Sequence, residues 1–225
     1  MSEPRESDRF WDDEELTAED IGRGTANRLK VLEELIDHAY RSNEPLDAAR
    51  VAKWHKDCLS GLSYVSNADE CFLGAYRGSR HPRLKKLRVG VRGRKGVVKE
   101  GAAPEKVKEE MDKFFRQLRK GMNDLAGTIE SDRDKTREEL LRIVEVAGWA
   151  HGEWVRIHPF ANGSGRTARL IANWVLVRFR LPPVVGIRPR PEHPYGPAAE
   201  ASMDGDHSKI TRFILTLLED PPAPS

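Results

Sequence analysis

The sequence predicts an all-α protein, a helical bundle that carries one small β-hairpin. Apolar residues recur at steps of three and four along most of the chain, which is the period of amphipathic helices. No alternation of strands and helices is present, and neither G-x-G-x-x-G nor G-x-x-x-x-G-K-[ST] occurs. Rossmann, P-loop and TIM-barrel architectures are therefore disfavoured.

The chain is long enough to form one domain with its own core. It has 225 residues, of which 38% are hydrophobic and 33% charged, so folding requires neither disulfides nor metals. Lys and Arg total 38 and Asp and Glu total 36, which leaves a net charge of +2. This balance removes any global argument for nucleic-acid binding. Cys58 and Cys71 are too few and too far apart for a disulfide framework, a redox pair or a zinc site.

The N-terminal sequence predicts no secretion signal, because MSEPRESDRF has no basic region followed by an apolar run. Charges interrupt the apolar stretches well before the ~18 residues that a membrane span needs. We therefore expect a cytoplasmic protein with reduced thiols and no membrane partner.

Helical spacing is clearest in six segments. They are residues 24–39, a helix opened by Pro45 and Asp47, a helix from Pro104 through Leu118, residues 136–157, residues 165–181 and a last helix around 210–218. The segment 136–157 carries apolar stripes on two faces, which predicts a central, buried helix. This helix has to end at His158, because Pro159 disfavours the right-handed helical conformation in the residue before it.

The predicted hairpin lies before Pro104. Two short β-compatible runs, Val89–Val91 and Gly96–Val98, flank the segment Arg92–Lys95. Glycines that bound β-branched residues in this way are typical of a hairpin.

The most informative segment joins the two most apolar helices and reads HPFANGSGRTAR over residues 158–169. Gly163 and Gly165 permit left-handed backbone conformations, so successive N–H groups can converge on an anion. The next helix directs its positive end to the same place. Arg166 and Arg169 lie three residues apart at that helix start, on neighbouring positions of one face. Together these features predict a site for an oligophosphate.

The same segment offers a proton acceptor and a metal ligand. His158 titrates near neutral pH and can take a proton from a hydroxyl, and Asn162 carries a hard oxygen of the kind that Mg²⁺ accepts beside phosphate oxygens. Each feature alone has an ordinary structural explanation, since a histidine before a proline can simply end a helix and Gly-Ser-Gly is common in loops. Their coincidence within twelve residues favours phosphoryl or nucleotidyl transfer.

With these residues the sequence resembles the Fic (Fido) domain family, whose pattern is H-x-F-x-[DE]-G-N-G-R-x-x-R. Residues 158–169 follow it with two departures. Further likenesses are the Trp54-His55 helix, Gly74-Ala75-Tyr76-Arg77 before the hairpin, Leu181-Pro182-Pro183, and the Tyr195…Gly205-Asp206 ending. The resemblance implies a Fic-like helical bundle over residues 20–220, preceded by an N-terminal extension (1–19) and followed by a tail (221–225).

The resemblance implies a protein adenylyltransferase, which transfers AMP from ATP to a Tyr, Thr or Ser hydroxyl of a target protein. His158 would be the general base and Asn162 the ligand of Mg²⁺, while Phe160 would anchor the loop in the core. The residues implied to bind the nucleotide are Gly163, Ser164, Gly165, Arg166 and Arg169. The hairpin at about 89–98 would be a flap on which the target protein docks by strand-like pairing.

Both departures from the family pattern weaken the expected chemistry. Asn162 replaces a carboxylate that binds Mg²⁺, and a charge pair at ~4 Å with an effective dielectric of ~20 is worth ~4 kcal/mol before desolvation. Ser164 replaces an asparagine whose side-chain amide donates to phosphate, and a hydroxyl is shorter. Weak AMP transfer, transfer of a phosphoryl group or another nucleotide, and a catalytically impaired nucleotide-binding regulatory module all remain open.

Members of the family often carry an inhibitory helix with the pattern [ST]-x-x-x-E-[GN]. The nearest match here, Ser66–Glu70, is followed by Cys71 and is interpreted as coincidence. We therefore expect no self-inhibitory helix, and control by an inhibitory partner protein or by poor intrinsic activity.

One stretch of the chain, Arg77 to Lys99, contains ten basic residues and no acidic ones. It is equally compatible with a solvated surface and with recruitment of an acidic target surface or of ATP. Nucleic acid is a weaker expectation, because interleaved aromatic residues are missing. His55, His151 and Trp154 are expected to pack in the core, and Tyr195 either packs there or stacks near a purine.

Overall fold

The computed structural model describes residues 17–41, 44–63, 70–92 and 98–220. Most of the predicted N-terminal extension, the predicted tail (221–225), Ser66–Asp69 and residues 93–97 of the hairpin lie outside these ranges. Within them, the protein is mostly α-helical with one two-stranded sheet, which confirms the predicted fold class. No helix of the described residues has the length and apolarity to cross a membrane.

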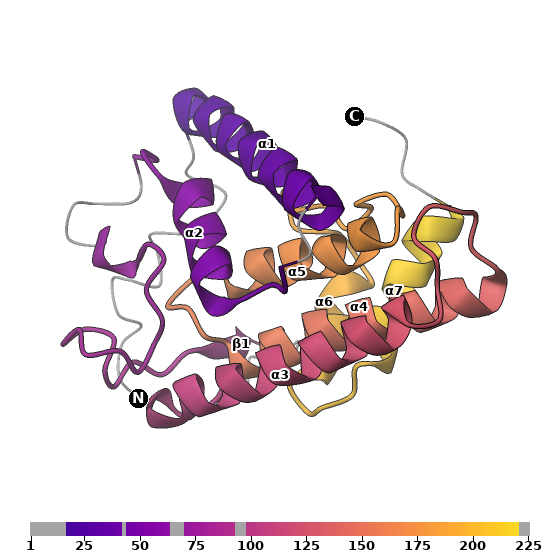
Figure 1. Ribbon diagram of the computed structural model, residues 1–225. Helices are drawn as coiled ribbons and strands as arrows, with labels where there is room; N and C mark the ends of the chain where they lie inside the picture. The colour runs from indigo at the N-terminus through magenta and orange to yellow at the C-terminus, as the bar shows by residue number, and fades with distance from the viewer. Residues whose placement is uncertain (1–16, 42–43, 64–69, 93–97, 221–225) are drawn as a thin grey trace.

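Seven α-helices and two strands make up the described fold (Figure 1). The elements are α1 (Ala18–Arg41), α2 (Ala48–Leu59), β1 (Gly90–Arg92), β2 (Val98–Glu100), α3 (Val107–Ala126), α4 (Arg137–Ile157), α5 (Ser164–Arg178), α6 (Tyr195–Ser202) and α7 (Ser208–Glu219). Short 3₁₀ helices precede the hairpin (η3, Glu70–Phe72) and α3 (η4, Pro104–Lys106).

The two central helices are α4 and α5, which pack against each other. Figure 1 shows α5 between α1 and α2 on one side and α3 and α4 on the other, while α6 and α7 pack on α4. From Thr167 through Val177 every residue of α5 is buried. The junction between α4 and α5 therefore lies against the core, and the chain that connects them is held from several sides.

Local sequence signals account for the helix starts. Thr136 and Glu139 form a reciprocal capping box at the start of α4, with N–H···O distances of 3.2 and 2.9 Å. Asp47 caps α2 by accepting from the backbone N–H of Arg50 at 2.8 Å. Pro104 occupies the first position of η4, where its missing N–H costs nothing. All six predicted helices are present.

Two local predictions differ from the structure. The hairpin is present, with Gly90 opposite Glu100 and Arg92 opposite Val98. Its second strand continues to Glu100, two residues beyond the predicted run Gly96–Val98, of which Gly96 and Val97 lie outside the described residues. The short helix α6 was not predicted. Its sequence, YGPAAEAS, contains Gly196 and Pro197 and has little amphipathic pattern, so tertiary packing on α4 and α7 defines it.

A buried hydrogen bond joins α4 to α5. The indole N–H of Trp154, a residue with 0% exposure, donates to the hydroxyl of Thr167 at 2.8 Å. Thr167 in turn lies within 3.2 Å of the carbonyl oxygens of Gly163 and Ser164. Because Tyr and Trp polar groups need partners when they are buried, this contact fixes how the two helices meet.

A buried histidine on α2 and another on α4 are neutral. His55 on α2 accepts the backbone N–H of Gly74 at Nδ1 (2.9 Å) and donates from Nε2 to the carbonyl oxygen of Asn162 (2.8 Å). His151 on α4 contacts the hydroxyl of Tyr195 through Nε2 at 3.0 Å. Burial lowers the pKa of each to about 3. Both are packing residues, as the sequence predicted.

Thr167→Val should lower the free energy of unfolding by about 1–3 kcal/mol, because the indole N–H of Trp154 would stay buried without an acceptor. Chemical denaturation monitored by circular dichroism measures this loss. Thr216→Val is the matched control, since Thr216 is exposed on α7 and its replacement should change stability by less than about 0.5 kcal/mol. Equal effects of the two substitutions would contradict the role of the hydrogen bond.

The histidines also predict an acid-labile fold. An unfolded histidine binds a proton near pH 6.5, whereas folded His55 and His151 do so only near pH 3. The unfolded state therefore binds more protons as the pH falls below about 6.5, and stability is lost at up to about 1.4 kcal/mol per pH unit for each histidine.

His55→Gln should remove one of these two contributions, so that the free energy of unfolding falls less steeply between pH 6 and pH 4. Urea denaturation across that range provides the measurement. His193 is exposed, and His193→Gln should leave the slope as it is. An unchanged slope in His55→Gln would show that His55 is not held neutral.

Candidate functional site at the junction of two helices

His158 is the C-cap residue of α4, at the start of the loop that joins α4 to α5, and it is partly buried. It leaves the right-handed helix with φ 52° and ψ 58°, a left-handed conformation that is uncommon outside glycine. Three hydrogen bonds hold it: its backbone N–H donates to Trp154 at 3.0 Å, its carbonyl accepts from Nε of Arg77 at 2.7 Å, and its Nδ1 lies 3.2 Å from the carbonyl oxygen of Val155.

The contact with Val155 defines the proton positions on the imidazole. A carbonyl oxygen can only accept, so Nδ1 carries the proton and Nε2 keeps its lone pair in the neutral ring. The pKa of His158 is lowered to about 4, chiefly by burial; the bond to Val155 acts in the opposite direction, and the positive charge of Arg77 contributes to the lowering. At neutral pH the ring is thus uncharged and offers Nε2 as a proton acceptor.

The chain after His158 is fixed by aromatic packing. Phe160 has 0% exposure and stacks on His55 and Tyr76, with ring centroids 3.9 and 4.6 Å apart. Tyr76 and Phe160 also form a β-bridge, and the backbone N–H of Arg77 donates to Pro159 at 2.8 Å. The expectation that Phe160 anchors the loop in the core is confirmed.

The next residues turn the chain into α5. Gly163 has φ 80°, and a Cβ at this position would lie 3.0 Å from the ring of His55, so glycine is required there. Gly165 lies within the helix and has no left-handed conformation, so only one of the two expected glycines has it. The hydroxyl of Ser164 accepts the N–H of Phe160 at 3.1 Å and is 1% exposed. The serine side chain therefore closes the loop and faces inward.

The N-terminus of α5 presents backbone N–H groups. Gly163 is its N-cap residue and makes no side-chain cap, and its carbonyl accepts the N–H of Thr167 at 3.0 Å. The amides of Ser164, Gly165 and Arg166 precede that first helical bond, so they have no acceptor within the helix. These amides and the helix dipole favour an anion at this end of α5.

The guanidinium groups of the two motif arginines have different neighbours. Arg166 lines an open pocket together with Arg28, Arg188 and Asp20. Arg169 is only 6% exposed; it donates to the carbonyl oxygen of Ile187 at 2.8 and 3.2 Å and to the hydroxyl of Tyr195 at 2.9 Å. Both guanidiniums stay near the motif glycines, because a Cβ on Gly163 would lie 3.7 Å from Nη1 of Arg166 and one on Gly165 3.4 Å from Nη1 of Arg169.

Tyr195 is a packing residue. It is 2% exposed and contacts the rings of His151 and Phe213 edge to face, at 5.5 Å in each case. Its hydroxyl accepts from Arg169 and therefore donates to Nε2 of His151. Of the two interpretations of Tyr195, the structure favours core packing, because a buried ring has no open face for a purine.

Asn162 offers one oxygen for a metal. Its backbone carbonyl is bound by His55, so the side-chain amide remains as its donor group, and the residue is partly exposed. In the part of the chain that the structure describes, no group of three His, Cys, Asp or Glu residues is placed to hold a metal ion. The donor set fits Mg²⁺ only as a companion of a phosphate ligand, which would supply most of the oxygens.

Two contributions to the site have no clear signal in the sequence. His55 positions the motif loop through a main-chain oxygen, whereas the sequence indicated only that it packs. Arg77, counted among the ten basic residues of the stretch 77–99, is 2% exposed and bonds to the carbonyl of His158. The likeness of Gly74-Ala75-Tyr76-Arg77 to the family singled out this arginine, but an arginine that bonds to carbonyl oxygens looks in sequence like any surface arginine, so its contacts were not predicted.

Comparison with known proteins adds to this geometry. A model of the Fic/DOC family matches residues 45–176, which include the α4–α5 junction. Protein adenylyltransferase Fic of Nematostella vectensis is 40% identical over 81 residues, or 36% of this chain and 19% of that protein. The protein of the same name from Aedes aegypti is 36% identical over 95 residues, or 42% of this chain and 19% of that protein. The chain thus spans about a fifth of the length of these relatives.

Two solved structures share the fold. A Fic domain containing signaling protein from Bacteroides thetaiotaomicron has a TM-score of 0.60 and 18% identity, over 87% of this chain and 68% of that chain. Fic-1 of C. elegans has a TM-score of 0.51 and 19% identity, over 89% of this chain and 53% of that chain. With the family model matching more than half of the residues, and with the same helical architecture in these structures, the chain belongs to the Fic/DOC family.

Proposed function

We propose that the protein transfers AMP from ATP to a Tyr, Thr or Ser hydroxyl of a target protein. Nε2 of His158 accepts the hydroxyl proton, and the hydroxyl oxygen forms a bond to the α-phosphorus of ATP. The bond between the α-phosphorus and the oxygen that bridges to the β-phosphate breaks, and pyrophosphate leaves. The observation that carries this proposal is the bond of Nδ1 to Val155, which leaves Nε2 as an acceptor beside the N-terminus of α5.

Phosphate binding rests on the start of α5. The backbone amides of Gly163, Ser164 and Gly165 hold the phosphates together with the positive end of the helix dipole. Arg166 and Arg169 add charge for the β- and γ-phosphates. Because Arg169 already donates to Ile187 and Tyr195, its share of this contact requires either its remaining N–H groups or a change of rotamer. Catalysis then depends on positioning and on charge stabilisation.

Mg²⁺ fits this site as part of the nucleotide complex. The side-chain oxygen of Asn162 would be its protein ligand, and the phosphates would provide further oxygens. The ion would neutralise charge on the phosphates. A neutral amide binds the ion more weakly than a carboxylate does, so we expect a high half-saturating concentration of Mg²⁺.

The hairpin β1–β2 is the proposed docking site of the target protein. Its short strands offer main-chain groups to which an extended segment can add as a further strand. Lys99 on β2 bonds to Asp204 at 2.5 Å and Arg88 to Glu100 at 2.7 Å, so two of the basic residues near the hairpin are paired. The exposed Arg80, Lys85 and Lys86 remain to attract an acidic target.

A second candidate is a nucleotide-binding regulatory module with little or no catalysis. The observations that favour it are the inward-facing hydroxyl of Ser164, which is bonded to Phe160, and the neutral side chain at Asn162. Such a module would bind ATP at the start of α5 and act through a partner protein.

His158→Ala should reduce labelling of target proteins by about 10²- to 10⁴-fold, because the general base is removed. ATP labelled at the α-phosphate, incubated with cell lysate and the protein, gives the readout after electrophoresis. ATP labelled only at the γ-phosphate is the control, and the protein should add no label to that of the lysate alone, which contains kinases. Equal labelling by the wild type and His158→Ala would reject the role of His158, and γ-phosphate labelling above that of the lysate alone would indicate phosphoryl transfer.

Asn162→Asp should lower the half-saturating concentration of Mg²⁺ by at least about tenfold, since a carboxylate adds a unit of negative charge beside the ion. Titration of labelling activity with Mg²⁺, or of nucleotide binding if activity is absent, measures the change. Asn123→Asp on the exposed face of α3 adds the same charge far from the loop and should have no effect.

The double variant Asn162→Asp with Ser164→Asn separates the two candidates. A regulatory module that has lost catalytic activity should gain labelling activity in this variant. An enzyme that works with Asn162 and Ser164 should change little or lose activity. Circular dichroism and nucleotide binding confirm that the variant is folded and that the site is intact.

A further inference from the structure

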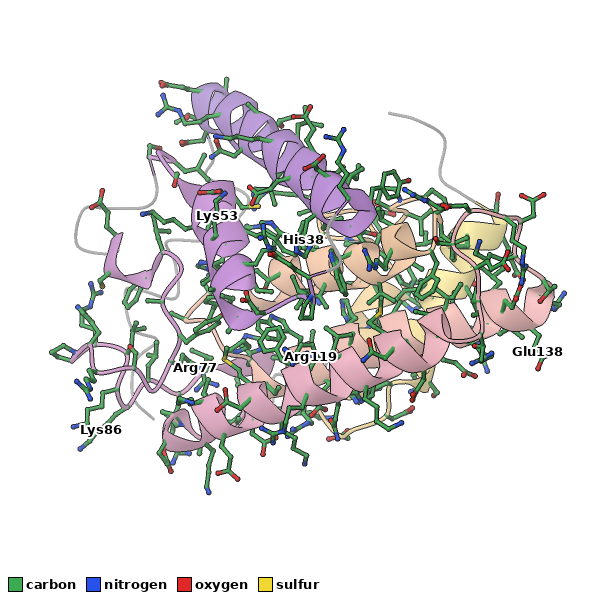
Figure 2. The ribbon with its side chains drawn as sticks, in the orientation of Figure 1. His38, Lys53, Arg77, Lys86, Arg119 and Glu138 are labelled. Atoms are coloured by element: carbon green, nitrogen blue, oxygen red, sulfur yellow. The ribbon has the colours of Figure 1, made fainter. Side chains whose placement is uncertain are left out.

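Arg77 is an unusual residue because it is a fully buried cation whose hydrogen bonds go only to carbonyl oxygens. It is 2% exposed, and its side chain bonds to four carbonyls, at distances of 2.7 to 3.1 Å. Figure 2 shows Arg77 between α2 and the N-terminal end of α3. Glu100 is the acidic residue whose charge acts on it, but the carboxylate of Glu100 bonds to Arg88.

The four carbonyls belong to three separate pieces of the chain. Ile157 and His158 form the C-terminal end of α4. Nη2 of Arg77 donates to the carbonyl oxygen of Ile157 at 3.1 Å, and Nε donates to that of His158 at 2.7 Å. Leu87 precedes β1 and accepts from Nη1 at 2.9 Å, whereas Ala102 follows β2 and accepts from Nη2 at 3.0 Å. One side chain therefore joins the end of α4 to both stems of the hairpin.

The second stem also contacts His158 directly. The backbone N–H of Ala102 donates to the carbonyl of Ile157 at 3.1 Å, and that of Gly101 donates to Val89 at 2.9 Å. A Cβ on Gly101 would lie 2.5 Å from Cβ of His158 and 3.3 Å from Nη2 of Arg77. Gly101, Cβ of His158 and the guanidinium of Arg77 are thus packed too closely for a methyl group to fit between them.

We infer that Arg77 is a positioning residue, which fixes the imidazole of His158 relative to the hairpin and so relative to the hydroxyl that the hairpin presents. This inference rests on the proposed function for its consequence in catalysis, whereas the arrangement itself is independent of the reaction. Arginine suits the role, because its planar fork has five donors and can reach several carbonyls at once. Lysine has three donors on one atom and cannot span the same set.

A purely structural role at a helix end would need fewer hydrogen bonds than Arg77 makes. A cation near the last turn of a helix interacts favourably with its free carbonyls, and Arg178 does so at the end of α1 by donating to the carbonyl of Ala39 at 2.9 Å. That contact joins two helices and involves no part of the junction. Arg77 instead places a desolvated charge beside His158, and burial lowers the pKa of this guanidinium to about 10, so it remains charged at neutral pH.

The first test measures the imidazole itself. In Arg77→Gln the positive charge near His158 is lost, so the pKa of His158 should rise, as followed by NMR titration of ¹⁵N-labelled histidines. In Arg77→Lys the charge stays and the pKa should remain near the wild-type value. Amide hydrogen exchange at Gly101 and Ala102 should accelerate in both variants, because neither side chain can hold both stems. Arg178→Gln should alter neither readout.

The second test uses labelling kinetics. Arg77→Gln should lower kcat at least about tenfold and raise KM for the target protein, with KM for ATP little changed, and Arg77→Lys should recover part of the loss. Arg178→Gln should leave all three constants unchanged at a temperature where every variant is folded. If the wild type does not label proteins, the proposed function fails, but the NMR and exchange results still decide the role of Arg77.

If Arg77→Gln does not fold, Arg77→Lys carries the test alone, since it keeps the charge but loses the planar fork. Exchange at Gly101 and Ala102 should then accelerate while the His158 pKa stays near the wild-type value, and wild-type exchange in this variant would overturn the inference. The inference is overturned if a folded Arg77→Gln keeps the wild-type His158 pKa and wild-type exchange at both stems, or if Arg178→Gln changes them to the same extent.

Discussion

The site depends on satisfying the backbone polar groups where α4 ends and α5 begins. A helix leaves carbonyls without partners at one end and amides without partners at the other, and here the two kinds of end are only a few residues apart. Two side chains bind groups that face the core: Arg77, from a distant segment, binds the carbonyls of Ile157 and His158, and Ser164, in the same loop, accepts the amide N–H of Phe160. In the proposed function, amides at the start of α5 bind the phosphates.

This arrangement separates two electrostatic environments within one loop. The imidazole of His158 lies at the carbonyl end of α4, where its Nδ1–H finds an acceptor in Val155. The phosphates would lie at the amide end of α5, where negative charge is favoured. A proton acceptor and an anion site can therefore lie side by side without the imidazolium forming an ion pair with the phosphates, because burial and Arg77 keep the ring neutral.

The sequence was sufficient for the features that local chemistry encodes. Apolar periodicity, Asp47 and the proline after His158 predicted the six longer helices. The sequence was not sufficient for α6, which tertiary packing defines, or for the contacts of Arg169, which are made with Ile187 and Tyr195. The contacts of Arg77 could not be predicted, because its acceptors are main-chain carbonyls, which every residue has.

The bond between His55 and residue 162 has a consequence for how the motif tolerates change. The imidazole of His55 holds the main-chain oxygen at this position and makes no use of the side chain. The path of the loop is therefore indifferent to whether an amide or an acid occurs there. Substitution at this site can therefore change the charge beside the junction while the surrounding architecture stays intact.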